Sequence, residues 1–189
     1  MRRFALLWII CFFCMFVHAE RGRADLREGD IIFQTSKSSQ SKFIAYATNS
    51  INTHCGIIVY QNDRLYVLEA SNVVKLTPLN NFINKGALGA RYSVYRYTDK
   101  PIKIRYKKYM GISYDSQFSL TNKKFYCSEL VWVIYKEQFG VELCKPRPLS
   151  SYNTLGLGKI MKRRGISSKS LFVAPSDLAA SKKLHCIKE

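Results

Sequence analysis

Two short β-rich runs joined by a turn, and one strong amphipathic helix after them, constrain the fold of this chain most. The runs at residues 56–60 and 65–68 flank a polar cluster at residues 61–63, which predicts a β-hairpin. Residues 127–139 carry apolar side chains at helical spacing, and Gly140 marks the helix end. Because strands fill the middle and the main helix follows them, the order predicts an α+β domain. Shorter strands are expected at residues 31–33, 73–76 and 92–97, and short helices at residues 41–49 and 176–183.

The N-terminal residues have the pattern of an export signal. Residues 1–3 give a short basic start, residues 4–17 are apolar, and residues 17–19 include the small side chain that a cleavage site needs. We therefore expect a signal peptide at residues 1–19, a single domain at residues 20–189, and a periplasmic or secreted mature protein. The alternative is an uncleaved membrane anchor, for which the apolar run is short.

Basic residues outnumber acidic residues throughout the chain. The formal net charge of +17 falls to +15 without residues 1–19, which contain two arginines and no acid. Such an excess attracts anionic surfaces, and for an exported protein we expect an anionic membrane or a wall polymer. The basic residues are scattered and no aromatic-basic repeat is present, so no nucleic-acid partner is expected.

Cys127 stands at the predicted start of the main helix. The N–H groups of a first helical turn lack partners and carry partial positive charge. Such a setting lowers the pKa of a thiol and can also hold an oxyanion. The position favours a nucleophilic cysteine, and the alternative is a buried cysteine that packs as a small apolar side chain.

A thiol nucleophile needs a base, and few histidines are available. Only His54 and His185 remain after signal removal, and His185 lies beside lysines near the chain end, where we expect solvent. A hairpin turn at residues 61–62 places His54 directly opposite Glu69. A turn at residues 62–63 leaves this pair diagonal on the same face, whereas a three-residue loop separates the two onto opposite faces. Glu69 is thus a candidate to orient the imidazole, and the alternative is an edge glutamate in water.

Several short segments, taken in order along the chain, are similar to one family. The resemblance is to the circularly permuted papain-like amidases of the NlpC superfamily, the YiiX-like group, over roughly residues 28–180. In this group the histidine strand precedes the cysteine helix, as His54 precedes Cys127 here. The segments are Gly29-Asp30-Ile31-Ile32-Phe33-Gln34, Thr53-His54-Cys55-Gly56-Ile57, Leu68-Glu69-Ala70, Tyr114-Asp115, Tyr126-Cys127-Ser128-Glu129-Leu130-Val131 and Pro175-Ser176-Asp177-Leu178.

The resemblance implies a papain-like fold in which an antiparallel sheet packs against the helix of the nucleophile. It implies Cys127 as nucleophile, His54 as base and Glu69 as the acid that orients the imidazole, without cofactor or metal. Tyr114 resembles a tyrosine that lines the active site and could bind the substrate amine or the oxyanion, with core packing as the alternative. Cys55 replaces the aliphatic residue usual at its position, and strand alternation predicts that it points away from His54.

Four cysteines remain after signal removal, and export favours their pairing. If Cys127 stays free, one bridge can form among the other three, and Cys144 with Cys186 is the pairing we expect. A metal site is a further alternative, but no C-x-x-C or H-x-x-x-H spacing supports it. Its ligands would be His54, Cys55, Cys127 and Cys144.

The function we expect is an exported cysteine hydrolase that cleaves an amide bond in a cell-wall peptide or a related small amide. One alternative is a lipid-directed acyl hydrolase or acyltransferase of the same fold, because permuted members of the superfamily also handle acyl chains. A second alternative is a non-catalytic envelope-binding protein, in which replacement of Cys127 would leave every measurable activity unchanged.

Overall fold

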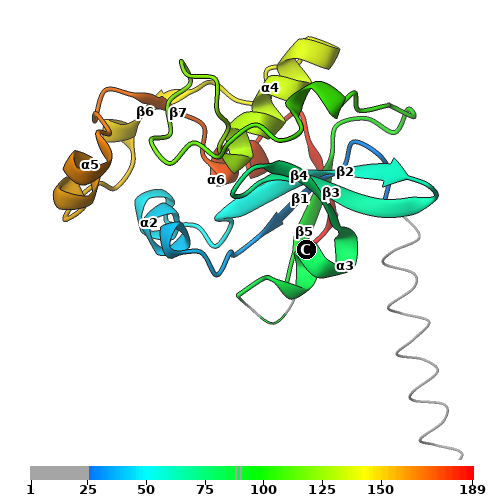
Figure 1. Cartoon of the computed structure of the whole chain (residues 1–189), viewed down its shortest axis with the longest axis horizontal. Coiled ribbons are helices and arrows are strands. Elements are labelled where there is room, and N and C mark those ends of the chain that lie inside the picture. The colour runs from blue at the N-terminus through cyan, green and yellow to red at the C-terminus, as the bar shows by residue number, and fades with distance from the viewer. Residues whose placement is uncertain (1–25, 88, 90) are drawn as a thin grey trace, which may run out of the picture.

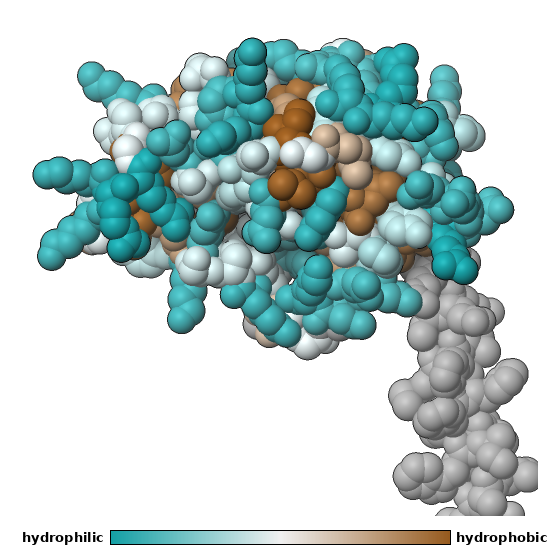
Figure 2. All heavy atoms as spheres, in the orientation of Figure 1, coloured by the Kyte–Doolittle hydropathy of each residue, from teal (hydrophilic) through white to brown (hydrophobic). Residues whose placement is uncertain are grey.

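The computed structural model describes residues 26–87, 89 and 91–189 (Figure 1). The signal peptide expected at residues 1–19 lies outside the described residues, so it stays a prediction. Within the described part of the chain, no helix has the length and apolar content needed to cross a bilayer. Hydrophilic side chains project from most of the visible face, and apolar side chains gather near its centre (Figure 2).

An antiparallel sheet of six strands forms the centre of the molecule, in the order β4-β3-β2-β1-β5-β8. A short second sheet pairs β6 with β7. This arrangement confirms the predicted α+β class. The strands are β1 (Ile31–Gln34), β2 (His54–Gln61), β3 (Arg64–Ala70), β4 (Val74–Pro78), β5 (Ser93–Arg96), β6 (Arg147–Pro148), β7 (Leu171–Phe172) and β8 (His185–Lys188). The helices are α2 (Ser39–Thr48), α3 (Leu79–Asn84), α4 (Cys127–Phe139), α5 (Gly158–Arg164) and α6 (Pro175–Ala179), with 3-10 turns η1 (Lys107–Tyr109) and η2 (Leu149–Ser151).

The predicted hairpin is β2–β3, and its turn is the later of the two expected two-residue turns. Gln61 pairs with Arg64 across the ladder, which leaves Asn62 and Asp63 as the turn residues. Both have positive φ, 48° and 56°, as a two-residue turn that follows the twist of its strands requires. Asparagine and aspartate tolerate this backbone region better than most residues, whereas Gln61 would not.

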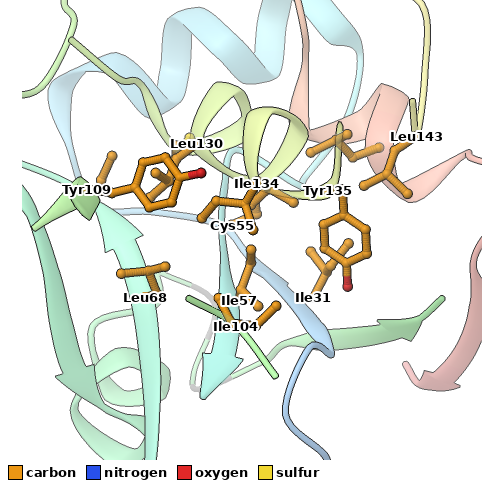
Figure 3. Packing of buried hydrophobic residues seen from close by; sticks show 14 of the residues in the cluster. Ile31, Cys55, Ile57, Leu68, Ile104, Tyr109, Leu130, Ile134, Tyr135 and Leu143 are labelled. Carbon is orange, nitrogen blue, oxygen red and sulfur yellow. The ribbon is translucent and has the colours of Figure 1, made fainter. Parts of the chain in front are cut away.

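The two faces of the sheet pack against different helices, with α4 on one face and α3 on the other (Figure 1). Alternate residues of β2 divide accordingly, because successive strand side chains point to opposite faces. Ile57 lies in the cluster under α4, and Ile58 lies in the cluster beside α3. The α4 cluster includes Ile31, Cys55, Ile57 and Leu68 from strands and Leu130, Ile134 and Tyr135 from the helix (Figure 3).

A third apolar cluster lies beside the sheet and supports the start of α4. Phe43 of α2, Met161 of α5 and Phe172 of β7 belong to it. Phe118 and Tyr126 fill its middle, with ring centroids 5.4 Å apart in an edge-to-face arrangement. The residue before Cys127 is therefore anchored in a packed core.

Several elements were not predicted from the sequence, among them α3 and β8. The six residues of α3 include three asparagines, which are weak helix formers. The residues of β8 are exposed or half-buried, so they lack the alternation that marks a strand. Cys186 of β8 pairs instead with Tyr95 of β5, a contact between segments far apart in the chain.

Candidate active site

Cys127 begins α4, and hydrogen bonds to the segment after β7 hold the first turn in place. The Val173 N–H donates to the Tyr126 phenol oxygen at 3.0 Å, and Ser128 Oγ donates to the Val173 carbonyl at 2.7 Å. The Tyr126 ring also stacks on Phe172, with centroids 5.2 Å apart. Because residues on both sides of Cys127 are tied to one backbone segment, the thiol has a fixed position.

His54 and Glu69 meet on the face of the sheet that α3 covers. The ladder makes them diagonal neighbours, and His54 Nε2 lies 2.6 Å from Glu69 Oε2. Thr77 Oγ1 donates to the other carboxylate oxygen, Oε1, at 2.5 Å. The imidazole stacks on Phe82 of α3 with centroids 5.5 Å apart. Both oxygens of a carboxylate that is 4% exposed are thus engaged, and the ring has one orientation.

The imidazole of His54 also lies close enough to the thiol of Cys127 for each group to shift the pKa of the other. Since Nε2 faces Glu69, Nδ1 is the nitrogen left for the sulfur. Burial by itself would lower the pKa of His54, but the hydrogen bonds and negative charges of Cys127 and Glu69 outweigh it and raise the pKa to about 10. The site therefore favours a thiolate beside an imidazolium.

Cys55 lies against Cys127 and is a site residue that the sequence analysis missed. The hydrogen bond from the Cys55 side chain is the strongest cause that holds the pKa of Cys127 well below its usual range, ahead of the interactions with His54. Burial and the neighbouring Cys127 charge raise the pKa of Cys55 itself, so Cys55 stays a protonated donor. Strand alternation gives the face on which Cys55 lies, but not that Cys127 covers that face.

Tyr114 reaches the same site from a short bridge with Phe125, close to the start of α4. Its hydroxyl donates to Gln40 Oε1 at 2.9 Å. Burial and the negative charge of Cys127 raise the pKa of the Tyr114 phenol, which keeps it an O–H donor. A cavity of about 420 Å³ opens beside Tyr114, His54 and Glu69.

The expected disulfide between Cys144 and Cys186 is wrong. All four cysteines of the described residues are free. Cys144 packs beside α4, where its carbonyl accepts a hydrogen bond from Trp132 Nε1 at 2.9 Å, whereas Cys186 is exposed on the edge strand β8. Across the described part of the chain, no three His, Cys, Asp or Glu side chains converge as metal ligands.

Comparison with known proteins places this geometry in a family. The family of permuted papain-like amidase enzymes, YaeF/YiiX, C92, has a model that matches residues 25–188. This chain belongs to that family. The C92 family description agrees with the order seen here, in which the histidine strand β2 precedes the cysteine helix α4.

Two relatives of this C92 chain come from Escherichia coli. The uncharacterized protein YiiX of strain K12 is 33% identical over 174 residues, which cover 82% of this chain and 86% of YiiX. A crystal structure described as metalloprotein YiiX from O157:H7 is also 33% identical, with a TM-score of 0.79, and the match covers 86% of this chain and 97% of that chain. The permuted papain-like fold is therefore confirmed.

Proposed function

We propose that this C92 chain hydrolyses an amide bond with Cys127 as nucleophile, His54 as acid and base, and Glu69 as the group that orients the imidazole. The observation that carries the proposal is the hydrogen-bonded chain of His54, Glu69 and Thr77, together with the opposite pKa shifts that His54 and Cys127 cause in each other. A nucleophile beside a base that an orienting acid holds has the arrangement of a catalytic triad.

The reaction has two steps. The Cys127 thiolate attacks the carbonyl carbon, and the imidazolium of His54 protonates the amine as the C–N bond breaks, which leaves an acyl thioester. Water then attacks the thioester while His54 takes its proton, and the acid and the free thiolate are released. The backbone N–H of Cys127 at the start of α4 can donate to the oxyanion, and the O–H of Tyr114 can do so once it turns from Gln40 Oε1.

Substrate and location are proposals from composition. The basic charge of the chain and the signal-like residues 1–19 favour an exported enzyme that acts on a peptide of the cell envelope. The solved relative is described as a metalloprotein. In this chain the described residues do not bring together a ligand set for a metal, and His54 is already engaged by Glu69, so no step is assigned to a metal.

The direct test supplies the protein with peptide stem fragments of the cell wall and, in parallel, with fatty-acyl esters. Amide cleavage, with an acyl adduct on Cys127 seen by mass spectrometry, is the expected result. We expect Cys127→Ala to lower this rate by at least ~10³-fold, because the nucleophile is removed. Cleavage of esters alone would assign the lipid-directed activity instead, and full activity in Cys127→Ala would contradict any catalytic role.

A further inference from the structure

The cavity beside His54 carries a positive charge that the reaction does not use. Lys75 of β4 and Lys85, which follows α3, both line it. The carboxylate among its lining residues is Glu69, and both oxygens of that group are bound by His54 and Thr77. No described carboxylate forms an ion pair with either lysine. Two ammonium groups therefore line a polar cavity, and the one carboxylate near them, Glu69, interacts with Lys75 but is already bound by His54 and Thr77.

The N-terminus of α2 adds to this positive potential. Ser38, Ser39 and Gln40 line the cavity, and they form the start of the ten-residue helix. The cap residue Ser38 makes no side-chain hydrogen bond to the first turn, and that turn contains no acid. The unpaired N–H groups of a first helical turn attract anions, so the helix reinforces the two lysines.

A buried amide at the cavity wall points to a ligand with a hydrogen-bond donor. Gln34 pairs with His54 across β1 and β2, lines the cavity and is 4% exposed. Its Oε1 is buried and has no hydrogen-bond partner. A buried acceptor without a donor costs free energy, which a small rotation toward a substrate N–H would recover.

We propose that this cavity binds an anionic group of the substrate, a carboxylate or a phosphate, through Lys75 and Lys85. The inference rests on the proposed function, because the anion would be part of the amide that reaches Cys127. An amide N–H beside an anionic group matches both Gln34 and the lysines. Lys75 lies directly across the ladder from Glu69, so the anion would sit next to the catalytic imidazole.

The test compares how fast iodoacetate and iodoacetamide alkylate Cys127, with the modified residue quantified by peptide mass spectrometry. The two reagents deliver similar small groups to the same sulfur, and only iodoacetate carries a negative charge. The rate with iodoacetate divided by the rate with iodoacetamide thus reports the local electrostatic potential, and no amide hydrolysis is needed. The variants are Lys75→Gln, Lys85→Gln and the double variant, with Lys159→Gln on α5 as a control that removes one exposed charge away from the cavity.

We expect the rate ratio to fall by about fivefold in each single variant and further in the double variant, because partly screened charges a few ångströms apart interact by roughly 1 kcal/mol. The control should stay within about twofold, since remote exposed charges are screened. An unchanged ratio in the double variant, or an equal fall in Lys159→Gln, would overturn the proposal. Failure of the proposed function is distinct: Cys127 would then react slowly with both reagents.

Protection experiments identify the kind of anion. N-acetylglutamate, glycerol phosphate and neutral N-acetylglutamine are each added while iodoacetamide alkylates Cys127 in the full-length protein. Protection by either anion, weakened in the double lysine variant, supports the anion site and shows whether carboxylate or phosphate is preferred. Equal protection by the neutral compound would rule out charge recognition.

Discussion

At the scale of single residues, the proton shared by Cys127 and His54 governs the proposed chemistry. The pKa of Cys127 is lowered and that of His54 is raised to about 10, so thiolate and imidazolium coexist between the two values. Hydrolysis should therefore rise as Cys127 ionises and fall as the pH passes about 10, where the proton for the leaving amine is lost. A pH–rate profile measures both limbs.

Replacement of Glu69 tests the orienting role. Glu69→Gln removes the charge that helps to raise the pKa of His54, so the alkaline limb should move to lower pH. The hydrolysis rate should fall by about 10²- to 10⁴-fold, since an amide does not hold the ring in the same tautomer. Thr77→Val, which removes one hydrogen bond to Glu69, should cause a smaller loss. An alkaline limb that stays in place in Glu69→Gln would contradict the assignment.

Cys55 acts on the reaction through Cys127, as a positioning residue. Cys55→Ala removes the hydrogen bond that lowers the pKa of Cys127, so alkylation of Cys127 should require higher pH. Cys55→Ser keeps a donor and should restore much of the wild-type profile. Cys186→Ala is the matched control, because Cys186 is exposed on the edge strand β8. If the profile of Cys55→Ala overlaid that of the wild type, the role of this thiol would be refuted.

At the scale of elements, the close approach of β2 and β3 sets the contact of His54 with Glu69. A Cβ added to Gly56 would lie 2.4 Å from Val67 Cγ1 and 2.6 Å from the Leu68 carbonyl. Gly56→Ala should therefore push the strands apart and lower the free energy of unfolding by about 1–3 kcal/mol. Gly158→Ala, at a helix start with open space, should change stability little. Urea unfolding of both variants measures the two free energies of unfolding. Equal midpoints for Gly56→Ala and Gly158→Ala would contradict the prediction.

Glu129 makes the stability of α4 depend on pH. Burial raises the pKa of this first-turn carboxyl to about 8, above its ordinary value of 4.5. The contribution of protonated Glu129 to the free energy of unfolding is thus complete below pH 4.5, and it is lost as the pH rises toward 8. Glu129→Gln cannot ionise, so its stability relative to the wild type should increase as the pH rises through this range and be greatest above pH 8. Thermal unfolding of the wild type and the variant at pH 5 and pH 8.5 measures this effect. The same difference in unfolding temperature at both pH values would contradict the prediction.

Some contacts could be predicted from local pattern, and others could not. Strand alternation with a two-residue turn placed His54 and Glu69 on one face, as the structure has them. The pairing of Cys127 with His54 was predicted from the scarcity of histidines and from the family resemblance, because a contact across such a separation leaves no periodic signal. The contact of Cys55 with Cys127 was missed for the same reason: alternation gives a face, and packing decides what covers it.

At the scale of the whole molecule, the excess positive charge predicts association with anionic surfaces. Vesicles with anionic head groups should bind the protein at low salt and release it at about 1 M salt, where the Debye length is about 3 Å. Vesicles of neutral lipid are the control, and cosedimentation is the measurement. Equal binding to both kinds of vesicle would show that the net charge of +17 does not direct the protein to such surfaces.

The rate of iodoacetamide labelling at Cys127 as a function of pH, in the wild type and in His54→Ala, tests most directly whether the thiol and the imidazole act as a pair. In the wild type, labelling should already be fast well below pH 8, the range in which a free thiol is protonated. In His54→Ala the curve should move to higher pH, because the partner of the thiolate is gone. Superimposable curves would remove His54 from the mechanism.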